Sequence, residues 1–202
     1  GGVILLALAA GNVAFLAGHF LLRYVALEVV GLIIAAAPLI EARDRKAGAH
    51  AAWVYLLLRV GDAGLLTAIL VLWAQTDTLA IDPALVAGAA LPTGFQAWVV
   101  GGFFLAVAVK IGLWPFHAWI RSGERLNRPA GAWLYATLMP NLGLYLLYRV
   151  IPLTVGRPGL RWGLIGVGIA AGGATLLAAL RRPDRRRRPS RILAGGMALI
   201  WC

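Results

Sequence analysis

The chain has 202 residues, of which 61% are hydrophobic and 13% are charged, and its mean hydropathy is +0.82. A soluble domain of this size needs a polar surface, and so few charges, most of them clustered, exclude one. Apolar runs of about 20 residues recur along the chain, and each is long enough to cross a bilayer as a helix. The composition therefore predicts an all-α polytopic membrane protein with a single transmembrane domain over residues 1–202.

Seven apolar spans are predicted as transmembrane helices. They cover about residues 2–19, 21–40, 52–74, 96–119, 130–150 and 162–180, and the last one starts near 192. The chain opens within an apolar run and lacks the basic region and cleavage site of a signal peptide. We therefore expect a segment of a longer chain.

Two of these helices are expected to be broken by proline. Pro115 has no N–H for the carbonyl of Ile111, and Pro140 likewise interrupts the helix over 130–150. Broken helices at membrane depth are tolerated where they line a protein or water cavity. The breaks therefore predict a polar channel wall, with Tyr135 and Asn141 as possible lining residues.

The basic residues are unevenly distributed among the loops. The formal net charge is +11, and Lys and Arg concentrate in residues 41–50, 121–128 and 181–191. The helix count places these three loops on one side, which the positive-inside rule assigns to the cytoplasm of a bacterial-type inner membrane. A basic chain can also bind nucleic acid, but this distribution favours topology and contact of 181–191 with lipid headgroups.

Five ionisable side chains lie within the predicted spans, where a charge costs about 2.5 to 3.5 kcal/mol or more. They are Glu28, Arg59, Asp62, Lys110 and Arg149. Glu28 lies about 11 Å into its helix, too deep for a short carboxylate to reach water, so it needs a partner. Lys110 lies about 21 Å into its own helix, and we expect Glu28 to neutralise it. A static ion pair, or a lysine that only extends to water, is the alternative.

Three further features bear on proton transfer. A desolvated lysine readily loses its proton, so Lys110 is a candidate switchable proton site. Arg59 and Asp62 are three residues apart on one helix face and can pair there, either as simple self-neutralisation or as part of a functional site. His117, just past Pro115, is placed to transfer protons near the cytoplasmic side.

Metal and cofactor chemistry find no support in the sequence. The one cysteine, Cys202, is the last residue, which leaves neither a disulfide framework nor a cysteine-based metal site. No histidine has a second metal-ligating residue beside it, and no cofactor motif is present. We therefore predict no metal and no cofactor for this chain.

Five stretches together carry a family resemblance. They are "ALEVVGLI", "LLLRVGDAGLL", "VKIGLWPFHAWI", "RPAGAWLYATLMPNLGLYLLYRV" and "RILAGGMALI". In order and spacing they resemble the antiporter-like subunits of respiratory complex I. The same superfamily includes Mrp-type sodium/proton antiporter subunits, membrane-bound hydrogenase subunits and the membrane partner of DAB-type inorganic-carbon transporters. The resemblance spans nearly the whole chain and about half of the usual family length.

The resemblance implies roles for the buried charges. Glu28 and Lys110 match the glutamate and lysine with which the family moves protons, and Arg59 and Asp62 match the arginine and aspartate of the helix between them. The chain also departs from the family. Tyr135 replaces a histidine, Asn141 stands where a titratable or hydroxyl residue is common, and Arg188 and Ser190 replace an aspartate and a lysine. The entry half of a proton path is thus preserved, and the relay beyond it is weakened.

The function implied is that of a proton-translocating antiporter-like subunit of a multi-subunit energy-converting complex, not catalytic by itself. Its expected partners are other membrane subunits, lipids and a soluble catalytic subunit, with no nucleic acid. One alternative is the ion-coupling membrane subunit of a DAB-type inorganic-carbon uptake complex. Another is a structural scaffold subunit whose proton path is partly lost. The central lysine favours protons over sodium as the transported ion.

Overall fold

The computed structural model describes residues 2–41, 45–125 and 132–181. In these ranges every regular element is helical. In chain order they are α1 (Gly2–Leu16), α2 (Phe20–Glu41), α3 (Arg45–Thr76), α4 (Ile81–Ala89), α5 (Thr93–Ile111), the 3-10 helix η1 (Phe116–Arg125), the π-helical η2 (Ala132–Leu138), α7 (Met139–Val150), the 3-10 turn η3 (Ile151–Thr154) and α8 (Pro158–Arg181). The helix predicted to start near 192 lies outside the described residues.

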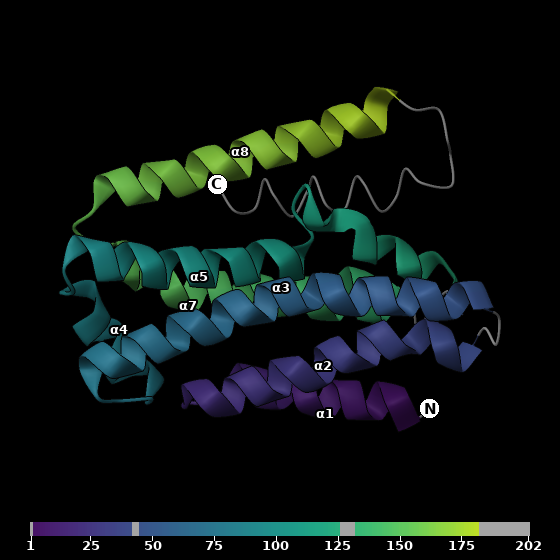
Figure 1. Ribbon diagram of the computed structural model, residues 1–202, viewed down its shortest axis with the longest axis horizontal. Helices are drawn as coiled ribbons and strands as arrows, with labels where there is room; N and C mark the ends of the chain where they lie inside the picture. The colour runs from purple at the N-terminus through teal and green to yellow at the C-terminus, as the bar shows by residue number, and fades with distance from the viewer. Residues whose placement is uncertain (1, 42–44, 126–131, 182–202) are drawn as a thin grey trace.

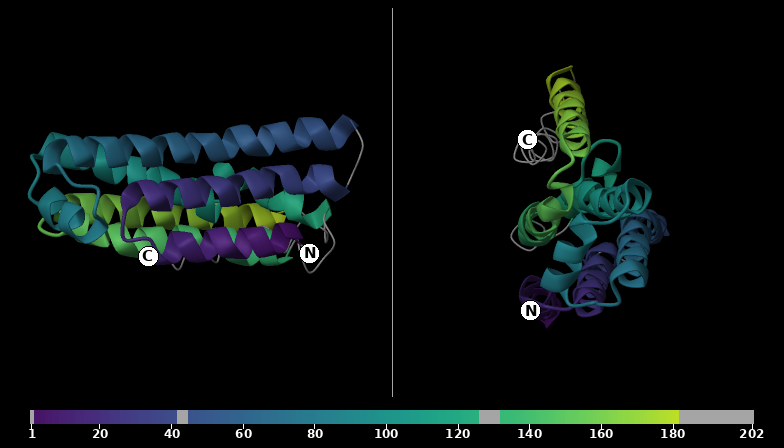
Figure 2. Two further views of the ribbon diagram at one scale, coloured as in Figure 1. Left: turned by 90° about the horizontal axis from the view of Figure 1, so that it is seen from below. Right: turned by 90° about the vertical axis from the view of Figure 1, so that its left-hand side faces the viewer.

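The long helices run side by side along the long axis of the molecule (Figure 1). α3 and α5 share the most extensive contact, α2 packs on α3, α1 packs on α2, and α7 packs on α5. Seen end-on, α1 and α8 lie at opposite edges of the bundle (Figure 2). α8 contacts the other elements mainly through η3.

Three stretches of the described chain are long and apolar enough to cross a membrane. They are Phe20–Leu39, Gly48–Thr76 and Thr93–Ile120. Large apolar side chains such as Leu56 and Trp98 are exposed on the outside of the bundle, 58% and 71% of their surface, as a lipid-facing surface requires. The structure thus confirms a helical fold with apolar helices of membrane-spanning length.

The turn between α1 and α2 meets the connection between α3 and α4 at one end of the bundle. The backbone N–H of Phe20 donates to the carbonyl of Leu79, and that of Ile81 donates to the carbonyl of Gly18, both at 2.9 Å. α4, which the sequence analysis did not predict, follows directly. Its buried residues recur with helical spacing, so one face packs on the bundle: Ile81, Ala84, Leu85 and Gly88.

Glycines bring α3 and α5 into unusually close contact. A Cβ added to Gly102 would lie 2.6 Å from the carbonyl oxygen of Gly64, and one added to Gly61 would lie 2.8 Å from the Cβ of Val109. Such distances leave no room for a side chain, so the two backbones touch. This contact sets the spacing of the polar groups that the two helices carry between them.

α5 ends earlier than predicted, and the reason is glycine rather than proline. Gly112 has φ 71° and ψ 41°, the left-handed conformation. Its N–H bonds to the carbonyl of Val109, and the N–H of Leu113 bonds to that of Ala108, which is the Schellman pattern of a helix end. The break expected at Pro115 therefore lies at Gly112, three residues before the proline.

The second predicted break coincides with its proline. The expected helix over 130–150 is divided into the π-helical η2, which ends at Leu138, and the α-helix α7, in which Pro140 occupies the first turn. Proline has no N–H to donate and fits the first turn of a helix without losing a bond. Pro140 thus marks the junction between the two helical forms.

We expect Gly112→Ala to destabilise the protein by about 2 kcal/mol or more, because alanine disfavours the left-handed conformation. Its Cβ would also lie 2.3 Å from the Cδ1 of Ile120. Gly101→Ala is the matched control in the same helix, since nothing lies within 4 Å of a Cβ there. Thermal unfolding of the purified membrane complex should show a lower melting temperature for Gly112→Ala alone. Equal melting temperatures for the two variants would contradict this assignment of the helix end.

Candidate functional site

A buried ion pair joins α3 to α5 at the centre of the bundle. The Nζ of Lys110 lies 2.6 Å from the Oδ1 of Asp62, and the two side chains are 1% and 2% exposed. Asp62 lies 17 residues from the start of α3 and 14 from its end, or about 26 and 21 Å along the helix. The pair is therefore far from both ends of this helix.

Two further charges extend the pair into a row of four. The Nη2 of Arg59 contacts the Oε2 of Glu28 on α2, and it also lies 3.4 Å from the Oδ2 of Asp62. The expected pairing of Arg59 with Asp62 is thus confirmed. The expected neutralisation of Lys110 by Glu28 is wrong, because Asp62, a shorter carboxylate on the neighbouring helix, takes that place. The row Glu28, Arg59, Asp62 and Lys110 alternates in sign, and its charges sum to zero.

The surrounding helices hold Lys110 from several directions. Gly61 lets α3 approach α5 one residue before Asp62, and Gly143 of α7 lies on the other side. A Cβ on Gly143 would be 3.1 Å from the Cβ of Lys110 and 2.6 Å from the Cγ2 of Ile111. Lys110 also lies in the last turn of α5, where the helix dipole favours a positive charge. Its ammonium is thus stabilised by a counter-charge and by its place in the helix.

Both carboxylates keep unused hydrogen-bonding capacity. Among the described residues, the Oε1 of Glu28 and the Oδ2 of Asp62 are buried and have no hydrogen-bond partner. Buried polar atoms are normally paired, and a proton or a water molecule would satisfy such an oxygen. The row can therefore accept protons without breaking an existing hydrogen bond at these two atoms.

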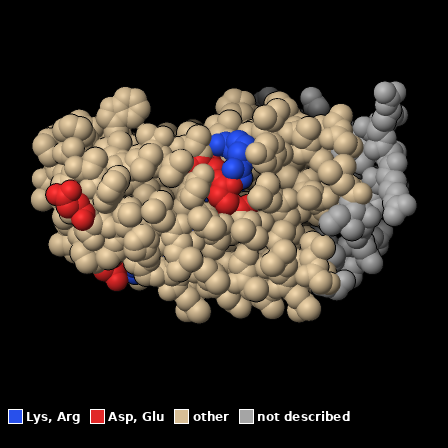
Figure 3. Space-filling model, turned by 60° about the horizontal axis from the view of Figure 1, so that its bottom comes forward, with Lys and Arg blue, Asp and Glu red and all other residues tan. Residues whose placement is uncertain are grey.

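The row reaches the molecular surface at one of its ends. Glu28 and Arg59 have side chains that are 13% and 30% exposed, whereas Asp62 and Lys110 are closed off. Figure 3 shows acidic and basic atoms meeting at one place in the middle of a face that is otherwise largely uncharged. The row thus leads from two partly exposed charges, called the opening below, to a fully buried amine.

The other predicted site residues lie outside this row. His117 is half-buried in η1, and its Cα would lie 3.6 Å from a Cβ on Gly112. Tyr135 is buried in η2, donates to the carbonyl of Ile34, and packs against Trp119 with ring centroids 6.0 Å apart. Asn141 is exposed on α7. In the described part of the chain, Tyr135 is thus engaged with Ile34 and Trp119, and Asn141 lies on the outside of α7.

Trp119 connects Tyr135 with the end of α5. Its Nε1–H donates to the carbonyl of Val109 at 2.7 Å, directly before Lys110 in the chain. This hydrogen bond fixes η1 against the last turn of α5. The sequence analysis singled out the stretch but not the tryptophan, whose role depends on the turn at Gly112.

Arg23 is a buried charge that the sequence did not single out. Its side chain is 3% exposed, and it donates to the carbonyls of Ala14 at 3.0 Å and Ala17 at 2.7 Å. Its guanidinium also lies 5.1 Å from the ring centroid of Tyr145. Arg23 thus satisfies carbonyls at the end of α1, a capping role that does not show in the spacing of the sequence.

Comparison with known proteins identifies the family. Residues 17–187 match the family described as NADH:quinone oxidoreductase/Mrp antiporter, TM. The chain belongs to this family. Among curated relatives, the chloroplastic NAD(P)H-quinone oxidoreductase subunit 5 of Piper cenocladum is 32% identical over 131 residues, 61% of this chain and 18% of the relative. The Na(+)/H(+) antiporter subunit A1 of Staphylococcus epidermidis is 27% identical over 129 residues, 63% and 16% respectively.

The fold is shared with a solved antiporter complex. A chain in the structure of the Mrp complex from Dietzia sp. superimposes with a TM-score of 0.89 at 24% sequence identity. The match covers 99% of this chain and 22% of that chain. The chain therefore spans about a fifth of the length of these family members, less than the half expected from the sequence. The resemblance to the family is confirmed.

We expect Asp62→Asn to destabilise the protein more than Lys110→Met. The first change leaves the buried ammonium without a carboxylate, which costs about 3–5 kcal/mol, whereas the second leaves Asp62 beside Arg59. The double variant should be more stable than Asp62→Asn alone, because it buries no unpaired ammonium. Thermal unfolding of the purified membrane complexes measures all three. Equal losses from the two single changes would show that Asp62 is not the main partner of Lys110.

Proposed function

We propose that the chain is a proton-translocating, antiporter-like subunit of a multi-subunit membrane complex. The observation that carries this proposal is the row of alternating charges from Glu28 to Lys110, which connects a partly exposed carboxylate with a buried amine. A purely structural ion pair needs neither a second pair nor an opening. Membership of the family and the similarity to complex I and Mrp antiporter subunits support the proposal.

In the mechanism, Arg59 is shared between Glu28 and Asp62, and Asp62 is shared between Arg59 and Lys110. When Glu28 takes up a proton, it loses its negative charge and its hold on the guanidinium of Arg59 weakens. Arg59, already 3.4 Å from Asp62, then pairs more closely with that carboxylate. The attraction between Asp62 and Lys110 then weakens, and the buried ammonium of Lys110 can release its proton. One protonation at the opening thus leads to one deprotonation at the buried end.

The opening also supports a partner subunit. A charged pair in the middle of an apolar face is costly against lipid and normally faces protein or water. A neighbouring membrane subunit that covers Glu28 and Arg59 would remove this cost and deliver protons. Other membrane subunits, and a soluble catalytic subunit of the same assembly, are therefore the proposed partners.

The proposed topology has seven spans in a bacterial-type inner membrane, two of them interrupted near Gly112 and Pro140. In this arrangement the basic loops 41–50, 121–128 and 181–191 face the cytoplasm. Figure 1 supports it in part, because α4, the α1–α2 turn and η3 gather at the end opposite to the start of α3. His117 would then lie on the cytoplasmic side of Lys110, where its imidazole could exchange protons.

We expect Glu28→Gln and Lys110→Met each to lower proton uptake at least about tenfold while the complex still assembles, because each removes a group that must change protonation state. Proton uptake by the assembled complex in proteoliposomes measures the effect. Asp82→Asn is the matched control, since Asp82 pairs with Arg149 outside the row. If both site variants transport like wild type, the chain is a structural scaffold and the proton path lies elsewhere.

We expect cysteines introduced at Arg45 and Asp77 to be accessible from opposite faces of the membrane. The test uses single cysteines in a Cys202→Ser background and a thiol reagent that does not cross the membrane. Arg45 begins α3 and Asp77 directly follows it, so one crossing separates them. The reagent should label Arg45→Cys only from the cytoplasmic side and Asp77→Cys only from the other side. Label at both from one side would contradict the topology.

A further inference from the structure

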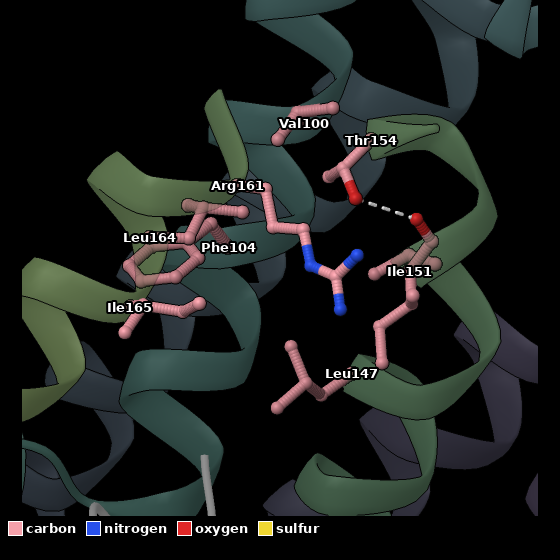
Figure 4. Close-up of a pocket in the computed structure, with 9 residues that line it drawn as sticks. Val100, Phe104, Leu147, Ile151, Thr154, Arg161, Leu164 and Ile165 are labelled. Atoms are coloured by element: carbon pink, nitrogen blue, oxygen red, sulfur yellow. Dashed lines mark hydrogen bonds between the residues drawn. The ribbon is translucent and has the colours of Figure 1, made fainter. Parts of the chain in front are cut away.

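A pocket lies between α8 and the main bundle. Its volume is about 140 Å³. Phe104 of α5, Leu147 of α7, Ile151 of η3 and Leu164 and Ile165 of α8 form much of its wall (Figure 4). The wall is largely apolar and comes from four elements that meet mainly at this point.

One cation lies within this apolar wall. The side chain of Arg161 extends from α8 across the pocket toward Leu147 and Ile151 (Figure 4). The one hydroxyl among the lining residues, on Thr154, already donates to the carbonyl of Ile151 at 2.8 Å. Within the described part of the chain, the guanidinium of Arg161 has neither an ion pair nor a hydrogen bond. The pocket therefore offers a positive charge without a counter-charge.

The depth of Arg161 fits a lipid headgroup. Arg161 is the fourth residue of α8, about 4.5 Å from the helix start, so its guanidinium lies near one end of this span. A guanidinium near the end of a span lies level with the lipid headgroups, where it can form charge-assisted hydrogen bonds to a phosphate. Beyond Arg161, α8 stands off the bundle: a Cβ on Gly163 or Gly166 would have no atom within 4 Å. This face of α8 is thus open beyond Arg161, so an apolar tail can leave the pocket along it.

We propose that this pocket binds an anionic phospholipid. The phosphate pairs with the guanidinium of Arg161 through charge-assisted hydrogen bonds, and one acyl chain lies against Phe104, Leu164 and Ile165. A zwitterionic lipid would bring its own cation next to Arg161, and an apolar protein segment would leave the guanidinium unpaired. Charge complementarity therefore selects an anionic headgroup with an apolar tail. This binding is separate from the proposed proton path, from which Arg161 is absent.

Photo-crosslinking tests the proposal in the purified complex that contains the full chain. The probe is a phosphatidylglycerol with a diazirine in one acyl chain, and mass spectrometry measures crosslinks to residues 100–104 and 161–165. Unlabelled phosphatidylglycerol should compete about fivefold better than phosphatidylcholine of the same acyl chains, which corresponds to about 1 kcal/mol for one basic side chain. Arg161→Gln should abolish this preference.

Two further variants make the outcome decisive. Arg157→Gln is the matched control, because Arg157 lies four residues earlier and bonds to Thr93 and the carbonyl of Leu91 instead; it should keep the preference. Leu164→Trp fills the pocket without changing charge, and it should reduce crosslinking several-fold even if Arg161→Gln fails to assemble. Three results would each overturn the proposal. They are equal competition by the two lipids, a preference that survives Arg161→Gln, and crosslinks that show a protein segment occupying the pocket.

Discussion

The burial of Lys110 is the constraint on which the centre of this structure depends. An ammonium that is 1% exposed needs a carboxylate within contact distance, and Asp62 supplies it at 2.6 Å. The two helices that carry the pair, α3 and α5, touch along their backbones, which the glycines at 61, 64 and 102 allow, so the pair is enclosed on this side. Among the described residues, the most extensive helix contact and the most deeply buried ion pair therefore occur at the same place.

The end of α5 serves the same constraint from the other direction. If the α-helix continued past Ile111, the carbonyls of its last turn would be used within the helix and η1 would lie elsewhere. The left-handed Gly112 turns the chain instead, so that Trp119 bonds to the carbonyl of Val109 and Tyr135 packs on Trp119. Gly112 therefore determines both the place of Lys110 in the last turn of α5 and the packing of Tyr135 on Trp119.

The sequence predicted the helices and the buried charges better than the contacts between them. Apolar runs and ionisable residues within them are local features, and among the described residues most helices lie near the predicted spans, although α5 ends earlier and α4 was not predicted. The partner of Lys110 was assigned to Glu28 because depth alone was known, whereas the choice of Asp62 depends on how α3 packs on α5. The break assigned to Pro115 begins at Gly112, whose left-handed conformation caps the helix three residues earlier. Arg23 was missed because its carbonyl partners come together only in the fold.

The two ends of the charged row differ in a way that bears on direction. At the surface end, Glu28 and Arg59 are partly exposed, and Arg59 already lies near two carboxylates, so it can change partners over a short distance. At the buried end, the nearest aromatic wall holds Tyr135, whose hydroxyl is committed to the carbonyl of Ile34. A proton that leaves Lys110 toward η2 would have to displace that bond or travel on water. In the proposed mechanism, the easier step is therefore the one at Glu28, and the departure of the proton from Lys110 is the step that the fold restricts more.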